Sequence, residues 1–499
     1  MKTNTLTARL LSLVALLLVI VMAFSACGET KGNESDAANA DVNSANDNAD
    51  ASAKDTASDN KDGSSKSKNT TSKSKNTTSK KTGNNASTGP VNLTDYANIP
   101  ASVKEKGVHV LMWRPYTETE QKQVDDFQSK TGIKVRTTVT TESEYSTKLI
   151  SLISGKDSPD VVCMGSTNFP GLTTKSLQPL DENKFNLNDS AWYKPYMDAY
   201  SVGGKFYAAA MRGSWSVEDC NYVTYYNPDV LKECGVTQMP YDLYKQGNWN
   251  WAKQKEIALA VANKGGASGE LIGLSTQGYD IFMLSAGLDF VSYDPVKSVF
   301  TNNIDTQSSE IISAWTQMAD LTAAHATSNL QFGKFAQGQV GMLTGIIYGL
   351  YTNGWFKPGV DTIQNIAQAV PVAGPTQSSA YTPVRPKCWG VPKGAKNIDG
   401  AAYFIRYYLD PKTINMSSTF HNKQFEEVFN IITSESAKKH IMRGEGIVDY
   451  VSSGTYSKVC NALNASTAAN LNTELNKYKG NIKTALTRAN KDLARAASK

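Results

Sequence analysis

The feature that most restricts how this chain can fold is a long polar stretch, residues 28–90, with almost no large apolar side chain. It consists mainly of Asn, Ser, Asp, Ala, Lys and Thr, and it repeats the heptad SKSKNTT at 65–71 and 72–78. A segment of this composition cannot bury enough apolar surface to offset the entropy that it would lose on ordering. We therefore predict a polar, disordered linker over 27–90 and a folded body that begins near Val91.

The residues before this linker have the layout of a secretory signal. Lys2 and Arg9 are followed by the apolar run Leu10–Phe24, which at 15 residues is short for a bilayer span of about 20 residues. The run ends in FSAC, with the cysteine at position 27.

This arrangement resembles a bacterial lipoprotein signal, in which the peptidase cuts before the cysteine and that cysteine receives lipid. The resemblance implies a signal peptide over 1–26, lipidation of Cys27 and a protein anchored on the extracellular face of the cell membrane. Phe24 departs from the pattern, because the family usually has Leu three residues before the cysteine. The alternative is an ordinary signal peptide, or a short membrane helix, with an incidental cysteine.

The composition limits the class of partner. The 499 residues include 51 Lys and Arg against 46 Asp and Glu, a net charge of +5, which is too balanced for a nucleic-acid binder. The 23 Tyr and 8 Trp are more informative, since both side chains combine an apolar face with a polar group and suit ligands that are themselves half apolar.

The folded body opens with apolar strands that alternate with amphipathic helices. The pattern predicts strands at 107–113, 133–141 and 159–165, a helix capped by Thr117 and Glu120 and ended by Gly132, and a second helix over 143–155. This β-α-β-α-β order predicts an α/β fold with a parallel sheet, in which ligands bind beyond the carboxyl ends of the strands. Two loops are then candidate ligand loops, RPYTE after the first strand and STNFPG after the third.

Several segments, in order along the chain, resemble the extracellular solute-binding proteins of ABC importers, especially the carbohydrate-binding group. They are VLMWRPYTETEQKQVDDFQSKTGIKV, SPDVVCMGSTNFPGL followed by LQPLDE, GGKFYAAAMRG, YVTYYNPDVLKECGV, GNWNWAKQKEIA and FAQGQVGMLTGIIYG. The resemblance covers nearly all of residues 97–450, with Ala252 and Gly341 as departures from the family pattern.

The resemblance implies a periplasmic-binding-protein-like fold with two α/β lobes, each a central sheet flanked by helices, and a ligand cleft between the lobes. Lobe 1 would comprise 97–213 and 388–425, and lobe 2 would comprise 214–387 and 426–499. The chain would cross between the lobes near 211–222, 382–392 and 421–427.

Sugars offer C–H faces to aromatic rings and hydroxyl groups to polar side chains. The candidate ligand contacts lie in the two strand-end loops, at the crossings and after the Phe-x-x-Gly segment. They are Arg114, Tyr116, Ser166, Asn168, Phe169, Arg212, Trp215, Tyr348 and Trp389. Each aromatic side chain has core packing as its alternative, and Arg212 could equally pair with a carboxylate. For Trp113, Trp249 and Trp251 we expect packing.

No pattern indicates chemistry or a metal. GxSxG, HExxH, Walker A and GxGxxG segments are absent, the four histidines are scattered, and the cysteine spacings fit no zinc site. With Cys27 lipidated, the five remaining cysteines cannot all pair within one chain. We expect no catalytic residues, no metal and no cofactor.

The sequence therefore predicts a lipid-anchored extracellular protein, a monomer, that captures a sugar or oligosaccharide and passes it to the transmembrane subunits of an ABC permease. Two alternatives stay open. One is a lipid-anchored glycoside hydrolase, whose catalytic carboxylates would lie about 5–9.5 Å apart. The other is the same fold binding a non-sugar solute, such as a peptide or a polyamine.

Overall fold

The computed structural model describes residues 90–498 except 266–269, 351–366 and 415–419. The predicted signal peptide, the predicted lipidation site Cys27 and the predicted linker up to Gly89 lie outside the described residues. Within the part of the chain that is described, no helix is long and apolar enough to cross a membrane.

The first sheet has the strand order β2-β1-β3-β16-β4, with β7 also paired to β16. β1 runs parallel to β2 and β3, whereas β16 returns antiparallel to β3. The strands are β1 (Val108–Met112), β2 (Val135–Val139), β3 (Val161–Met164), β4 (Leu177–Gln178), β7 (Ala208–Ala209) and β16 (Cys388–Pro392). The predicted β-α-β-α-β order is confirmed by β1, α3 (Glu118–Thr131), β2, α4 (Tyr145–Ser154) and β3.

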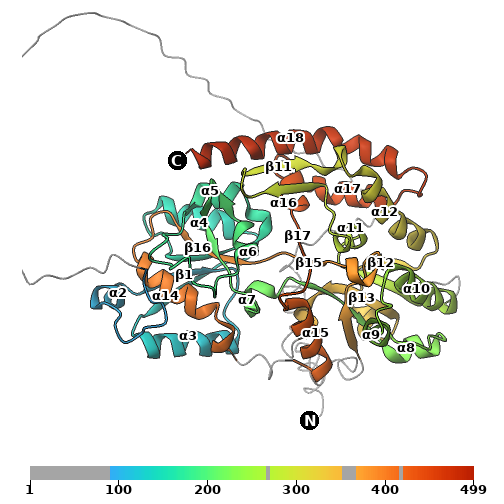
Figure 1. Ribbon diagram of the computed structural model, residues 1–499, viewed down its shortest axis with the longest axis horizontal. Coiled ribbons are helices and arrows are strands. Elements are labelled where there is room, and N and C mark those ends of the chain that lie inside the picture. Colours follow the sequence, from blue (N-terminus) through green and yellow to red (C-terminus); the bar gives the residue numbers. More distant parts are fainter. Residues whose placement is uncertain (1–89, 266–269, 351–366, 415–419, 499) are drawn as a thin grey trace, which may run out of the picture. The chain divides into compact units, whose positions relative to one another are not determined.

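The start and the end of α3 follow from its sequence. Thr117 accepts a hydrogen bond from the Glu120 amide, and the Glu120 side chain accepts one from the Thr117 amide, which completes the predicted capping box. Gly132 ends the helix with φ of 72°, a left-handed conformation that glycine adopts without strain. The other helices of this lobe are α2 (Ala101–Lys106), α5 (Gly171–Ser176), α6 (Lys194–Asp198) and α14 (Ile398–Tyr408) (Figure 1).

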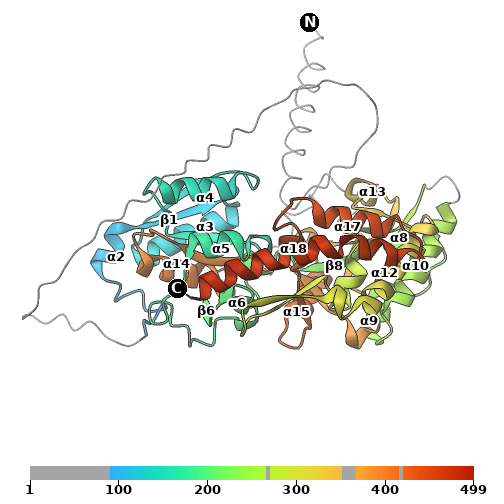
Figure 2. The ribbon, with the colours of Figure 1, turned by 90° about the horizontal axis from the view of Figure 1, so that it is seen from above.

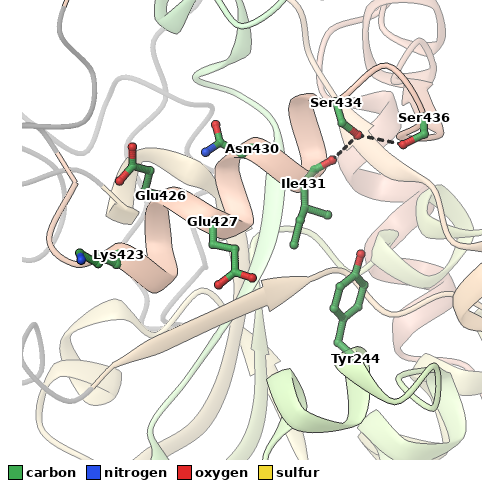
Figure 3. A pocket seen from close by; sticks show the side chains of 8 residues that line it. All are labelled: Tyr244, Lys423, Glu426, Glu427, Asn430, Ile431, Ser434 and Ser436. Atoms are coloured by element: carbon green, nitrogen blue, oxygen red, sulfur yellow. Dashed lines mark hydrogen bonds between the residues drawn. The ribbon is translucent and has the colours of Figure 1, made fainter.

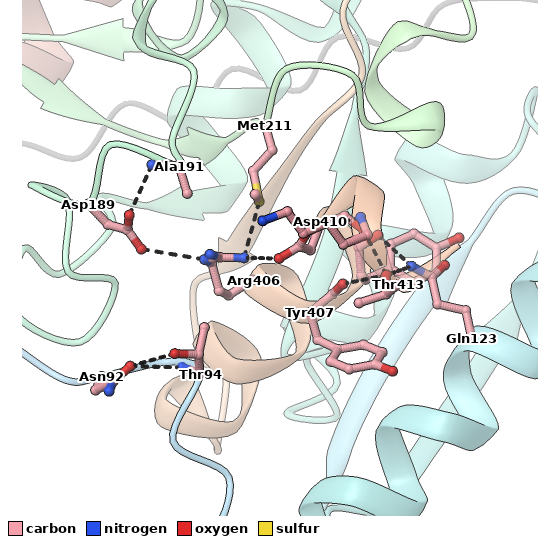
Figure 4. Close-up of polar contacts among 12 residues, drawn as sticks. Asn92, Thr94, Gln123, Asp189, Ala191, Met211, Arg406, Tyr407, Asp410 and Thr413 are labelled. Carbon is pink, nitrogen blue, oxygen red and sulfur yellow. Dashed lines mark hydrogen bonds and ion pairs between the residues drawn. The ribbon is translucent and has the colours of Figure 1, made fainter. Parts of the chain in front are cut away.

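A polar network ties the end of α14 to the loop with Asp189, to Met211 and to α3 (Figure 4). The Arg406 guanidinium donates to Asp410 at 2.8 Å and lies 3.5 Å from an Asp189 carboxylate oxygen. It also contacts the Met211 sulfur at 3.7 Å. On the α3 side, the Gln123 amide donates to the hydroxyl of Thr413 at 2.6 Å. The end of α14 is thus held on both sides, and Met211, where the chain leaves this lobe, is part of the same network.

The second sheet has the order β12-β9-β13-β8-β14. β13 lies at its centre, antiparallel to β8 and parallel to β9. The strands are β8 (Tyr222–Tyr226), β9 (Ile272–Thr276), β12 (Thr327–Asn329), β13 (Val340–Ile346) and β14 (Gln368–Pro371). The helices of this lobe are α8 (Pro228–Glu233), α9 (Pro240–Lys245), α10 (Trp251–Gly265), α11 (Ile281–Ser285), α12 (Ser308–Ala323), α13 (Phe332–Ala336) and α15 (Lys423–Thr433).

The chain passes between the two sheets at three places. The first passage runs from β7 to β8 through the short helix α7 (Trp215–Glu218), and the second runs from β15 (Thr382–Val384) to β16. The third follows α14 and ends where α15 packs on β14. A further strand, β17 (Lys439–Ile441), which the sequence did not predict, pairs in parallel with β15. The passages fall close to the three predicted crossings, and the precise lobe boundaries stay predictions.

The C-terminal part of the chain contacts both lobes. It comprises α16 (Gly444–Val448), α17 (Thr455–Asn464) and α18 (Leu471–Ala497). α18 packs on its neighbour α17, on α12 and β11 of the second lobe, and on α5 and β5 of the first (Figures 1 and 2). Here β11 (Val299–Asn302) forms a hairpin with β10 (Val291–Asp294), and β5 (Ser201–Val202) forms one with β6 (Lys205–Phe206).

Candidate functional site: charged and aromatic groups between the two sheets

The loop after β1 carries a tightly held arginine. Arg114 makes two parallel hydrogen bonds to Glu120, at 2.7 and 2.8 Å, and Glu120 is only 2% exposed. Burial alone would raise the pKa of Glu120, but hydrogen bonds from Arg114 and Thr117 lower it below its usual value. The capping box of α3 therefore supplies the carboxylate that orients Arg114.

An ion pair joins the first and second passages. Lys387, just before β16, lies 2.9 Å from one carboxylate oxygen of Asp219, just after α7. The Lys387 ammonium also lies 4.8 Å from the centre of the Trp113 ring, within the range of a cation–π contact. The second oxygen of Asp219, Oδ1, is buried and has no hydrogen-bond partner among the described residues.

Tyr348 brings the second lobe to this ion pair. It lies in the short helix η4 (Ile347–Leu350), directly after β13. Burial raises the pKa of Tyr348, and the charges of Arg114, Glu120, Asp219 and Lys387 act on it as well. The end of β13 therefore lies near the loop after β1 and the two passages, close enough for their charges to act on Tyr348. We call Trp113, Arg114, Asp219, Tyr348 and Lys387 the central site.

The passages are braced beside the central site by a second, fully buried carboxylate. Glu218 is 0% exposed and accepts hydrogen bonds from the Tyr196 hydroxyl at 2.8 Å and the Asn221 amide at 2.6 Å. Lys439 of β17 lies 3.2 Å from the same carboxylate. Burial lowers the pKa of Lys439, although Glu218 opposes that shift. This network ties β17 to the residue that precedes Asp219.

Three other predicted contacts lie close to the central site in sequence. Trp215, at the start of α7, is 8% exposed, and Tyr116 packs against Tyr408 with ring centres 6.2 Å apart. Arg212 is 38% exposed at its side chain and faces Glu435 at 3.6 Å and the Tyr193 ring at 5.9 Å. Arg212 thus pairs with a carboxylate, which was the alternative to ligand binding for this residue.

The loop after β3 starts beside Lys387, because Met164 at the end of β3 pairs with Cys388, but its side chains contact other parts of the fold. Phe169 is 1% exposed, and its ring lies 5.1 Å from that of Tyr293 and 6.0 Å from that of Phe300, both on the β10–β11 hairpin. The Asn168 amide oxygen accepts from the Gly165 amide at 3.0 Å, and Ser166, 5% exposed, lies in the turn η2 (Ser166–Asn168) against α16.

Trp389 is also fully buried, with its ring 4.8 Å from that of Tyr408. For these four residues the contacts favour packing, and a role in ligand binding stays an untested prediction.

Three members of the central site were not predicted as ligand contacts. Trp113 was expected to pack, and it does lie near Tyr145, with ring centres 6.3 Å apart, yet Lys387 covers it. Asp219 and Lys387 belong to no recognisable motif. Their only signal in the sequence is that both fall inside predicted crossings.

A separate pocket of about 630 Å³ opens between α9 and α15 (Figure 3). None of the predicted ligand contacts lines it. Its lining residues are Tyr244, Lys423, Glu426, Glu427, Asn430, Ile431, Ser434 and Ser436. Glu427 and Ile431 of α15 point toward Tyr244 of α9 in this view (Figure 3). Nowhere in the described ranges do three or more His, Cys, Asp or Glu side chains gather as a metal site would need.

Two helix-flanked sheets, joined by three passages with charged and aromatic groups between them, define the class of two-lobed periplasmic binding proteins. The family model of the bacterial extracellular solute-binding proteins matches residues 114–414, and the chain belongs to that family.

Solved structures of low sequence identity share the fold. The galacto-N-biose-/lacto-N-biose I-binding protein of Bifidobacterium longum, in complex with lacto-N-biose, has a TM-score of 0.56 at 16% identity, over 77% of this chain and 97% of that one. UgpB from Mycobacterium tuberculosis, in complex with glycerophosphocholine, has a TM-score of 0.55 at 14% identity, over 77% and 99%. The sugar-binding protein MalE from Xanthomonas citri has a TM-score of 0.54 at 14% identity, over 78% and 98%. No curated protein sequence matches the chain.

Proposed function

We propose that this protein captures a sugar or oligosaccharide outside the cell and delivers it to the transmembrane subunits of an ABC importer. The observation that carries the proposal is the central site. Tyr348 from one lobe lies close enough to Arg114, Asp219 and Lys387 for their charges to act on its hydroxyl. An aromatic face beside hydrogen-bonding charged groups is what a ligand with C–H faces and hydroxyl groups requires.

Binding without chemistry is the mechanism that this arrangement supports. A ligand held between Tyr348 and the groups on the first lobe favours the conformation in which both can touch it, so binding shifts the protein toward lobe closure. The energy for transport then comes from the partner ATPase. As a further part of the proposal, lipid on Cys27 tethers the protein to the membrane, and the polar linker separates the folded body from that anchor.

A ligand screen tests the sugar assignment. Purified residues 90–499 are heated with a panel of mono- and oligosaccharides, with choline, glycerophosphocholine and spermidine as non-sugar probes. A ligand that binds only the native state raises the melting temperature. Stabilisation by a sugar, with the sugar recovered intact after hours of incubation, is the expected result. Stabilisation by a non-sugar probe alone would contradict the ligand class, and consumption of the sugar would favour the hydrolase alternative.

The tether has its own test. In cells, Cys27→Ala is expected to prevent lipid attachment, so that the protein is released or stays unprocessed, and metabolic labelling with a fatty acid measures this. Cys234→Ala serves as the control, since the predicted signal does not include it. Lipid labelling of the Cys27 variant at the level of the unaltered protein would exclude this anchor.

A further inference from the structure

The oxygen Asp219 Oδ1 needs an explanation, because a buried acceptor without a donor is costly. Asp219 is 9% exposed as a residue, and its other oxygen is engaged by Lys387 at 2.9 Å. Oδ1 has no donor among the described residues, although it is fully shielded. It lies in the central site, among groups that come from both lobes.

The charges around this oxygen are already balanced within the protein. Asp219 is paired with Lys387 and Arg114 with Glu120. A formally charged ligand would find no unpaired counter-charge in these two pairs, and it would lose its hydration on entering. Oδ1 calls for a donor instead, and a ligand hydroxyl is a neutral donor of the right size.

We infer that Asp219 and Lys387 together determine the ligand specificity of the central site: Asp219 Oδ1 accepts a hydrogen bond from a hydroxyl of an uncharged ligand, and Lys387 holds the carboxylate in place and keeps the site neutral. The inference rests on the proposed function and narrows it to neutral polyhydroxylated ligands. Sugar acids and sugar phosphates are excluded, because their anionic groups would face the Asp219 carboxylate.

The wild-type protein gives the first measurement. Calorimetric titrations use maltose, lactose, cellobiose and xylobiose as neutral probes, and glucuronate, galacturonate and glucose 6-phosphate as anionic probes. At least one neutral probe is expected to bind, at least tenfold more tightly than every anionic probe. A preference for an anionic probe overturns the inference, even if no variant can be purified. If no sugar of either kind binds, the proposed function fails, and this inference fails with it.

Asp219→Asn gives the second measurement. The Lys387 ammonium only donates hydrogen bonds, so we expect the amide oxygen of the new asparagine to face it. The NH₂ group of the asparagine then faces the ligand. The acceptor for the ligand hydroxyl is lost, and the negative charge beside Lys387 is removed. Since a hydrogen bond to a charged group contributes about 1.5–3 kcal/mol, affinity for the neutral probe is expected to fall roughly ten- to hundredfold. The ratio of anionic to neutral affinity is expected to rise by at least the same factor.

The matched control is Asp399→Asn, which removes the same charge from an ion pair with Lys184, 2.9 Å apart and part-exposed in the first lobe. It is expected to bind the neutral probe as the wild type does. Circular dichroism and thermal unfolding establish that both variants are folded. Unchanged neutral affinity in a folded Asp219→Asn protein overturns the inference and leaves the proposed function intact.

Discussion

At the scale of single residues, the central site combines a stacking face with fixed charges, and Tyr348 is its contribution from the second lobe. Tyr348→Ala removes this face, and burying a large apolar side chain is worth about 1.5–3 kcal/mol. We therefore expect the affinity for the sugar found in the screen to fall roughly ten- to hundredfold, measured by calorimetry. Truncating a core aromatic side chain costs about 3–5 kcal/mol in the free energy of unfolding. Because Tyr348 is part-exposed, the free energy of unfolding of the ligand-free variant should fall by less than that. An unchanged affinity would show that the ligand binds elsewhere.

A buried pair of titratable groups makes a second residue-scale prediction. His440 lies 4.0 Å from Asp289, which is 0% exposed at its side chain. Burial lowers the pKa of His440 to about 4 and raises the pKa of Asp289 to about 6. Between pH 4 and 6.5 the native protein therefore binds fewer protons at His440 than the unfolded chain does, so this group destabilises the fold as pH falls. Asp289 has the opposite effect on stability. Between its raised pKa of about 6 and the ordinary pKa of an aspartate, the native protein binds more protons at Asp289 than the unfolded chain does, so this group stabilises the fold as pH falls.

His440→Gln removes the first of these two effects. As pH falls from 6.5 to 4, the variant should become more stable relative to the wild type, by roughly 3 kcal/mol at most in the free energy of unfolding. Its melting temperature relative to the wild type should therefore rise over the same range. At pH 7.5, where His440 is neutral in both states, its titration contributes nothing to the difference between the two proteins. Melting curves that stay parallel between pH 4.5 and 7.5 would show that the His440 pKa is not lowered.

At the scale of elements, the start of α3 couples local folding to the central site. Thr117→Ala removes the side-chain acceptor for the Glu120 amide and is expected to cost about 1 kcal/mol in the free energy of unfolding, measured with urea. The same substitution two residues after the cap, Thr119→Ala, is the control, and it should cost nothing because Ala is the better helix former. Equal stability of the two variants would mean that the capping box contributes nothing to folding.

The opening elements of the first lobe, from β1 to β3, could be predicted because each has a local cause. The apolar runs of β1 and β3, the capping box of α3 and Gly132 all act over a few residues, and the structure confirms them. The surroundings of the loop after β3 could not be predicted this way. Its position at a strand end favours a ligand site, which stays a prediction, and Phe169 packs against aromatic rings from a hairpin more than a hundred residues further along the chain. Asp219 and Lys387 were missed for the same reason, since only the fold brings them together.

At the scale of the whole folded body, the contacts between the β10–β11 hairpin and the first lobe depend on Arg443. This side chain is 7% exposed, donates to the Ala199 carbonyl at 2.7 Å, and lies 5.3 Å from the Phe169 ring centre and 5.5 Å from that of Tyr293. Arg443→Met should lower the free energy of unfolding by roughly 1–3 kcal/mol, since a charged hydrogen bond is lost.

Hydrogen exchange locates that loss. The Gly203 amide, which donates across this contact to Ser298, should exchange faster in Arg443→Met, while the amides of β13 keep their protection. Arg488→Met is the control, because the Arg488 side chain is 66% exposed and its removal should change stability by less than about 0.5 kcal/mol. Uniformly faster exchange throughout the body would contradict a local role for Arg443.

The long helix α18 has a mechanical consequence for lobe closure. Its 27 residues make a rod of about 40 Å, and a helix of fixed length can neither stretch nor shorten when the lobes move. One part packs on α12 and α17, while near its other end Ala497 lies so close to Gly203 that a Cβ added to the glycine would come within 3.2 Å of it. Rotation of one lobe must therefore be accompanied by sliding at one of these two contacts. The small side chains near that end of the rod, in the run ARAAS (494–498), leave a surface with few interlocking groups, and such a surface permits shear.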